Sequence, residues 1–168
     1  ANPLKDARID LTVVSTGWDG ISFWVHPRAG IVAGAGASGS DPAVVMTANK
    51  WLLVGSDVFY DMNDFRTDDL GATWSIPFRQ QGLARRTDAD EPDVDVAVSD
   101  FQPAWHAATK TLLGTGHTVR YRNDELLPSP RRRETAYATY DPARRMWSEW
   151  RALELPDLPG YRNCGAGC

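Results

Sequence analysis

The chain has 168 residues, of which 42% are hydrophobic and 24% are charged, and its formal net charge is -4. This length allows one domain with a hydrophobic core, or part of a larger domain. The mild acidity gives no electrostatic reason to expect nucleic acid or an anionic membrane surface as a partner. No apolar stretch approaches the roughly 20 residues that a membrane-spanning helix needs, so we expect no membrane span.

The cysteines and histidines do not indicate a metal site. The two cysteines, Cys164 and Cys168, form a CxxxC pair without a neighbouring histidine, which is a poor zinc pattern and leaves their redox state open. The three histidines, His26, His106 and His117, show no ligand spacing, and a lone strand histidine is more often a packing residue. We therefore predict neither a metal nor an organic cofactor.

Short segments rich in Val, Ile, Thr and aromatic residues, separated by Gly, Pro, Asn and Asp, predict an all-β fold. No stretch of ten or more residues shows an apolar period of 3.6 residues. Between these segments, the acid-rich stretch that begins at Asp57 is predicted to be a loop, and 79–93 to be a polar connection between two units. The predicted strands are 9–15, 21–26, 30–35, 43–47, 51–56, 94–98, 110–114, 118–122, 135–140 and 146–153.

Two hairpins resemble each other in sequence, at residues 65–75 and 138–148. Each consists of a strand, a turn led by aspartate, and a Trp-Ser pair that opens a second strand. The two Trp-Ser pairs lie 73 positions apart. Repeated hairpin units indicate a radial or stacked architecture, because one unit cannot bury its own faces.

The first hairpin matches the pattern Ser/Thr-x-Asp-x-Gly-x-Thr-Trp, the Asp box, at every fixed position. Aspartate can accept hydrogen bonds from amides of its own turn, and glycine can adopt the positive φ that the turn needs. Threonine restarts the strand and the tryptophan ring is expected to pack into the sheet. The second hairpin keeps Asp141 and Trp147 but lacks the glycine. These positions have a structural role: Thr67, Asp69, Gly71, Thr73 and Trp74.

The Asp box, with the order of features along residues 20–150, resembles the first two blades of bacterial exo-sialidases (neuraminidases). The resemblance implies a partial β-propeller of about two to three blades out of six, forming a single domain over 1–168. Blade 1 would span about 20–80 and blade 2 about 94–155. The nucleophilic tyrosine, its glutamate and further arginines of the family would lie beyond the C-terminus, so the chain is expected to be an inactive fragment.

The resemblance also implies the roles of individual residues. In the family, an arginine on the first inner strand begins the triad that holds the sialic acid carboxylate, and Arg28 is the nearest match here. The general acid/base is an aspartate between that arginine and the first Asp box. Asp57, 29 residues after Arg28 and 12 before Asp69, is the candidate, with Asp61 and Asp64 as rivals.

A third element of the resemblance is an aspartate that precedes a proline near the substrate pocket. Asp100, followed by Pro103, fits this description, and Trp105 and His106 would then reach the central funnel. A structural turn formed by Asp100 and Pro103 is an equal alternative.

The expected function is that of a sialidase-like exo-glycosidase acting on sialylated or other glycans. The alternative is a non-catalytic Asp-box propeller that binds glycans or proteins, with Trp24 and Trp105 as sugar platforms. The resemblance implies a secreted or periplasmic protein, and the sequence does not predict an oligomeric state.

Overall fold

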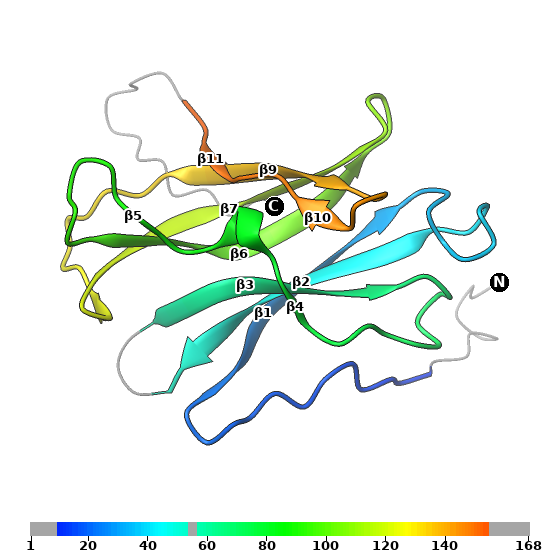
Figure 1. Ribbon diagram of the computed structural model, residues 1–168, viewed down its shortest axis with the longest axis horizontal. Helices are drawn as coiled ribbons and strands as arrows, with labels where there is room; N and C mark the ends of the chain where they lie inside the picture. The colour runs from blue at the N-terminus through cyan, green and yellow to red at the C-terminus, as the bar shows by residue number, and fades with distance from the viewer. Residues whose placement is uncertain (1–9, 54–56, 155–168) are drawn as a thin grey trace, which may run out of the picture.

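The computed structural model of the protein describes residues 10–53 and 57–154. The described residues form two antiparallel β-sheets, which lie against each other as two layers (Figure 1). They contain no α-helix and one short 3-10 helix, η1 (Gln81–Leu83). The prediction of an all-β fold is therefore confirmed.

The first sheet is a four-stranded meander in the order β1-β2-β3-β4. The second sheet has the order β10-β9-β7-β6-β5, with β8 beside β7 and β11 beside β9. The strands of the first sheet are β1 (Ser22–Val32), β2 (Ala43–Leu52), β3 (Val58–Thr67) and β4 (Phe78–Arg79). Those of the second are β5 (Arg86–Thr87), β6 (Asp95–His106), β7 (Thr111–Arg122), β8 (Glu125–Leu126), β9 (Thr135–Asp141), β10 (Met146–Trp147) and β11 (Arg151–Ala152).

The first long strands of the two sheets, β1 and β6, share an irregularity. The pairing of β1 with β2 shifts between Val25 and Arg28, and the pairing of β6 with β7 shifts between Ser99 and Gln102. One residue in each bulge has a left-handed backbone, with φ 51° at His26 and φ 50° at Asp100. Such conformations cost energy in residues other than glycine. The same bulge therefore occurs in both sheets, with the two left-handed residues 74 positions apart.

The sheets meet where the face of the first covers β6. Pairing with β5 covers only the start of β6, at Asp95 and Val96. Further along, side chains of β2 satisfy two carbonyls of β6: Thr47 Oγ1 donates to Phe101 O (2.6 Å) and Asn49 Nδ2 donates to Val98 O (3.0 Å). Because unpaired buried carbonyls destabilise a fold, these two bonds fix how the sheets sit on each other.

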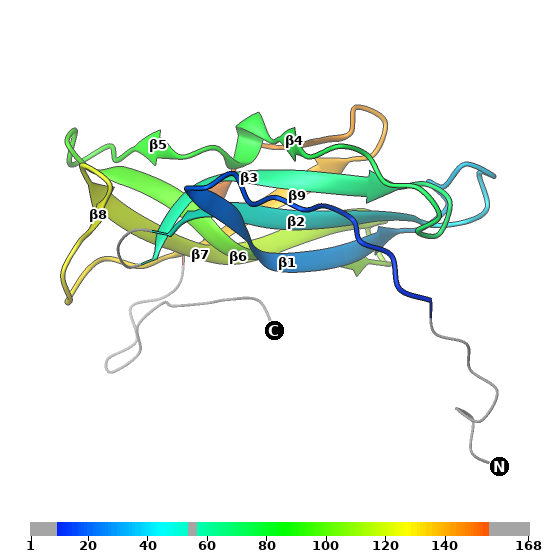
Figure 2. The same cartoon turned by 90° about the horizontal axis from the view of Figure 1, so that it is seen from below.

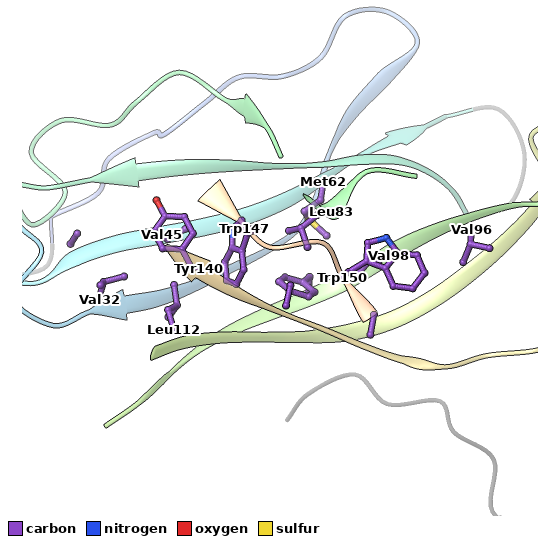
Figure 3. Packing of buried hydrophobic residues seen from close by; sticks show 14 residues of the cluster. Val32, Val45, Met62, Leu83, Val96, Val98, Leu112, Tyr140, Trp147 and Trp150 are labelled. Carbon is purple, nitrogen blue, oxygen red and sulfur yellow. The ribbon is translucent and has the colours of Figure 1, made fainter. Parts of the chain in front are cut away.

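The largest hydrophobic cluster joins both sheets and includes Trp147 and Trp150 (Figure 3). Trp147 lies beside Tyr140 and meets Phe101 edge-on, with ring centroids 5.1 Å apart. Glycine makes room for this packing, since a Cβ on Gly114 would lie 2.0 Å from the ring of Phe101. The aromatic core of the second sheet therefore depends on a small residue in β7.

Several predicted boundaries are wrong. Residues 10–15 are not a strand, one strand, β1, replaces the predicted pair 21–26 and 30–35 and ends at Val32, and β7 joins the predicted strands 110–114 and 118–122. The acid-rich stretch predicted as a loop contains β3, because Asp61 and Asp64 are satisfied by partners from the segment 79–85. Figure 2 shows that β4, η1 and β5 follow one another along one side of the sheets.

Two further expectations concern the membrane and the cysteines. Within 10–53 and 57–154, no helix has the length and apolar character needed to cross a membrane. Cys164 and Cys168 lie outside the described residues.

Candidate functional site

Arg28 and Asp100, two predicted substrate-binding residues, lie together at the two bulges. Arg28 Nη2 is 2.6 Å from Asp100 Oδ1, and the two side chains are 38% and 23% exposed. They come from different sheets and are joined because the bulges of β1 and β6 lie side by side. Arg28 is the more exposed partner, so a ligand anion can approach its guanidinium, whereas Asp100 Oδ1 is buried.

Two histidines extend this group. His26 Nδ1 lies 3.4 Å from Ser99 Oγ, and His117 is the β7 partner of Ser99. Burial lowers the pKa of His117, the negative charge of Asp100 opposes that shift, and the positive charges of Arg133 and His26 add to it. We call His26, Arg28, Ser99, Asp100 and His117 the bulge cluster.

The bulge cluster combines one guanidinium, its partner carboxylate and two imidazoles. Its Arg28 is the group suited to an anion, because a guanidinium can meet a carboxylate through two hydrogen bonds. The buried Nδ1 of His117 has no hydrogen-bond partner among the described residues. Within residues 10–53 and 57–154, no group of three His, Cys, Asp or Glu side chains is arranged as metal ligands would be.

The histidines of this cluster were not predicted as site residues. The left-handed bulges were not predicted, although His26 and Asp100, which have positive φ, belong to the residue types enriched in that conformation. The proline that precedes Arg28 was a further local hint of an interrupted strand.

Asp57, the predicted general acid, lies apart from the bulge cluster. Strand β2 pairs with both β1 and β3, so it gives a common scale. Asp57 directly precedes β3, whose first residue pairs with Leu52 of β2, whereas Arg28 of β1 pairs with Thr47 of β2. The five residues between these levels correspond to about 16 Å along the strand. Asp57 is exposed, and its carbonyl accepts a hydrogen bond from the hydroxyl of Tyr121 (2.6 Å).

The rivals of Asp57 have structural partners. Asp61 pairs with Arg79 (2.5 Å) and accepts a hydrogen bond from the Arg85 amide (2.8 Å). Asp64 is buried and accepts a hydrogen bond from Gln80 Nε2 (2.8 Å). Burial raises the pKa of Asp64 to about 6, against the effect of that bond.

Trp105 and His106 lie at the far end of β6. Trp105 is half-buried and packs against the main hydrophobic cluster. His106 is exposed at the β6–β7 turn, where its Nδ1 lies 2.7 Å from Thr109 Oγ1. Arg28 meets Asp100 in the bulge of β6, which ends at Gln102. His106 is four residues further along the strand, or about 13 Å, so it does not lie with Arg28.

The Asp box forms a turn held by its own side chains. Thr73 donates to both carboxylate oxygens of Asp69, from Oγ1 at 2.6 Å and from N at 2.9 Å, and these bonds are the main reason that the pKa of Asp69 falls to about 2. The Gly71 amide donates to Thr67 Oγ1 (2.8 Å), and Gly71 has φ 94°. Trp74 is only half-buried and joins neither hydrophobic cluster.

The second hairpin repeats the backbone arrangement of the first. The Arg66 amide donates to Ser75 Oγ (2.9 Å) and the Ser75 amide to Arg66 O (2.8 Å). Thr139 and Ser148 exchange the same two bonds, at 3.1 and 2.8 Å. The two hairpins therefore share these bonds, just as β1 and β6 share a bulge.

Comparison with known proteins adds no relative. No protein-family model, no curated protein and no solved structure matches this chain.

Proposed function

We propose that the protein is a sialidase-like exo-glycosidase whose first two propeller blades are the two sheets described above. It would remove a terminal sialic acid, or a related sugar acid, from a glycan. The proposal combines the sequence resemblance with the architecture, in which two meanders repeat from bulge to turn. Each sheet would be one blade, with β1 and β6 as the inner strands.

The observation that carries the proposal is the meeting of Arg28 and Asp100 at matching bulges. Backbone strain at His26 and Asp100 is the kind of cost that proteins retain at functional sites. It brings an arginine to a shared edge where a sugar carboxylate can reach it, with His26 and His117 close by. In this proposal Asp100 holds the guanidinium of Arg28 in place until the substrate carboxylate takes the place of the Asp100 carboxylate.

The chemistry of such an enzyme needs an acid to protonate the leaving oxygen. Asp57 keeps that predicted role as a separate hypothesis, because its backbone lies about five residues away from Arg28 along the strand direction. Sialidases use a tyrosine as nucleophile, since a carboxylate nucleophile would repel the carboxylate of the substrate. In the resemblance that tyrosine comes from a later blade, so Tyr121, Tyr137 and Tyr140 are not assigned to it.

The separation of Asp57 from Arg28 favours the second candidate function, a non-catalytic propeller that binds acidic glycans. Binding requires the bulge cluster alone, and no acid at Asp57. The two functions share the first step and differ in turnover, so one set of variants can distinguish them.

The test is an assay of the protein, in its natural full length, with a fluorogenic α-sialoside. We expect Arg28→Ala to reduce kcat/KM about tenfold to hundredfold, as for loss of a charge-assisted hydrogen bond, and Asp57→Asn to reduce kcat with little effect on KM. Arg151→Ala, on exposed β11, is the control. Saturable binding of sialyllactose that needs Arg28, without any turnover, would support the binding protein instead. Unchanged activity in both variants would refute both site assignments.

A further inference from the structure

A cavity lies apart from the bulge cluster, between the first hairpin with β4 and the second hairpin with β10, and has a volume of about 320 Å³. Such a volume is at the lower end of the range for small-molecule sites. We call it the hairpin groove. Neither the Asp box nor the proposed glycosidase chemistry uses it.

The floor of the hairpin groove is polar and buried. Asp64, Arg66 and Tyr140 line it and are 5%, 8% and 4% exposed. Arg66 is held in place by Asp68 Oδ1 (2.6 Å), Ala35 O (2.9 Å) and the Tyr140 hydroxyl (3.3 Å). These bonds give the groove a fixed donor and acceptor pattern before any ligand arrives.

Asp64 lies buried beside this floor and has two side-chain donors near it. Gln80 donates the hydrogen bond that Asp64 Oδ2 accepts, but burial still dominates and raises the pKa of the carboxyl to about 6. The indole N–H of Trp147 adds a smaller hydrogen-bond effect that lowers the same pKa. A carboxylate has about four acceptor positions, so Asp64 retains acceptor capacity for a ligand hydroxyl.

The rim of the groove is apolar and exposed. Ile76, Phe78 and Met146 are 84%, 53% and 41% exposed. A ligand that covered these apolar side chains would remove them from water, which favours binding. Ser75 adds a hydroxyl that accepts from the Arg66 amide but donates to no described residue. Its repeat counterpart, Ser148, donates to Glu149 O (3.3 Å).

The charges around the groove select among ligands. Arg144 and Arg145 stand exposed at its mouth, where they pair with Asp141 (3.7 Å) and Asp68 (2.9 Å), so the mouth favours neither an anion nor a cation. On the floor an ion of either sign would meet a like charge, because Asp64 and Arg66 both line it. A neutral ring with several hydroxyls fits both conditions, because its hydroxyls can donate to Asp64 and accept from Arg66 while its apolar face covers Phe78.

We propose that the hairpin groove is a second binding site, which takes one neutral sugar ring of a glycan. The pairing of the strands separates it from the bulge cluster. Arg28, Thr47, Asp64 and Phe78 lie opposite one another on β1, β2, β3 and β4, and neighbouring strands are about 4.8 Å apart. Buried Thr47 stands between the two sites and bonds Phe101 O, so the sites can bind independently.

The test is NMR titration of the chain with galactose, glucose and N-acetylglucosamine as free monosaccharides. We expect saturable shifts at groove residues with millimolar affinity for at least one sugar. Phe78→Ala and Asp64→Asn should each weaken binding about tenfold, as for loss of one good contact. Phe78 is half-exposed, so its replacement should not prevent folding. Arg28→Ala should leave this affinity unchanged.

The result does not depend on the proposed glycosidase function. Absence of saturable binding, or equal loss of binding in Arg28→Ala, would overturn the second site. Displacement of the sugar by acetate or benzylamine at equal concentration would overturn the choice of a neutral ligand. Retained sialoside hydrolysis in Phe78→Ala, with weakened monosaccharide binding, would support two separate sites.

Discussion

The two hairpins, at residues 65–75 and 138–148, share two hydrogen bonds but are stabilised in different ways. In the first, hydrogen bonds among Thr67, Asp69, Gly71 and Thr73 hold the turn, and Trp74 stays half-buried. In the second, the turn has fewer such bonds, and Trp147 is 3% exposed in the main core. A complete sequence motif thus marks the hairpin that is locally stable, whereas the incomplete copy relies on tertiary packing.

The largest effect should come from removing Trp147. Trp147→Ala would leave a cavity beside Phe101 and Tyr140, and such substitutions cost about 3–5 kcal/mol. Trp74→Ala, the matched change in the first hairpin, should cost less than about 1 kcal/mol because the side chain is half-exposed and outside the core. Denaturant unfolding of both variants measures the difference. Equal losses would show that the two tryptophans have the same structural role.

A second contrast concerns matching positions of β3 and β9. Asp64 lies opposite Thr47 and Tyr137 lies opposite Thr115, each beside the bulge position of its own sheet. Burial raises the folded-state pKa of Asp64 to about 6, above the value near 3.9 of an unfolded chain. The charge of Asp64 therefore destabilises the folded protein above pH 6, and this penalty disappears as the pH falls below about 4.

Asp64→Asn should remove that penalty. The variant should match the wild type near pH 4 and exceed its stability at pH 7 by about 3 kcal/mol at most, from 1.36 kcal/mol per pKa unit. Tyr137→Phe, at the matching position, should show no such dependence on pH. Urea unfolding of the three proteins at pH 4 and pH 7 measures this. A variant that is less stable than the wild type at pH 7 would show that hydrogen bonds to Asp64 outweigh its desolvation.

The sequence predicts features whose partners are near in the chain. All the bonds that hold Asp69 come from residues 67–73, so the Asp box could be recognised and explained from sequence alone. Short segments rich in Val, Ile, Thr and aromatic residues, separated by turn-forming residues, were also sufficient for the all-β prediction. Both depend on interactions within one strand or one turn.

Features that depend on distant segments could not be predicted. β3 was taken for a loop because its acids appear unfavourable in a strand until Gln80 and Arg79 return to pair with them. The ion pair of Arg28 with Asp100 arises from two bulges in different sheets. Trp74 and Trp147 follow similar turns, yet only the second meets Phe101. In each case the deciding contact joins residues that are between 16 and 72 positions apart in the chain.

The smallest expected effect concerns the charge of Asp69. Hydrogen bonds from Thr73, and then from Thr67, lower its folded-state pKa to about 2, below the unfolded value near 3.9. Because the folded state binds this proton less readily, the charge stabilises the fold above about pH 4, and the contribution is lost as the pH falls from about 4 to 2.

Asp69→Asn should therefore be less stable than the wild type at pH 6, and the gap should narrow as the pH approaches 2. Asp141→Asn is the matched change, and we expect a smaller gap, because Asp141 accepts hydrogen bonds only from turn amides at 2.9 and 3.1 Å and none from a threonine hydroxyl. Urea midpoints between pH 2 and 6 give both curves. If the stability difference between Asp69→Asn and the wild type stayed constant with pH, Asp69 would act through its hydrogen bonds rather than through its charge. The contrast between the hairpins would then rest on Trp147 alone.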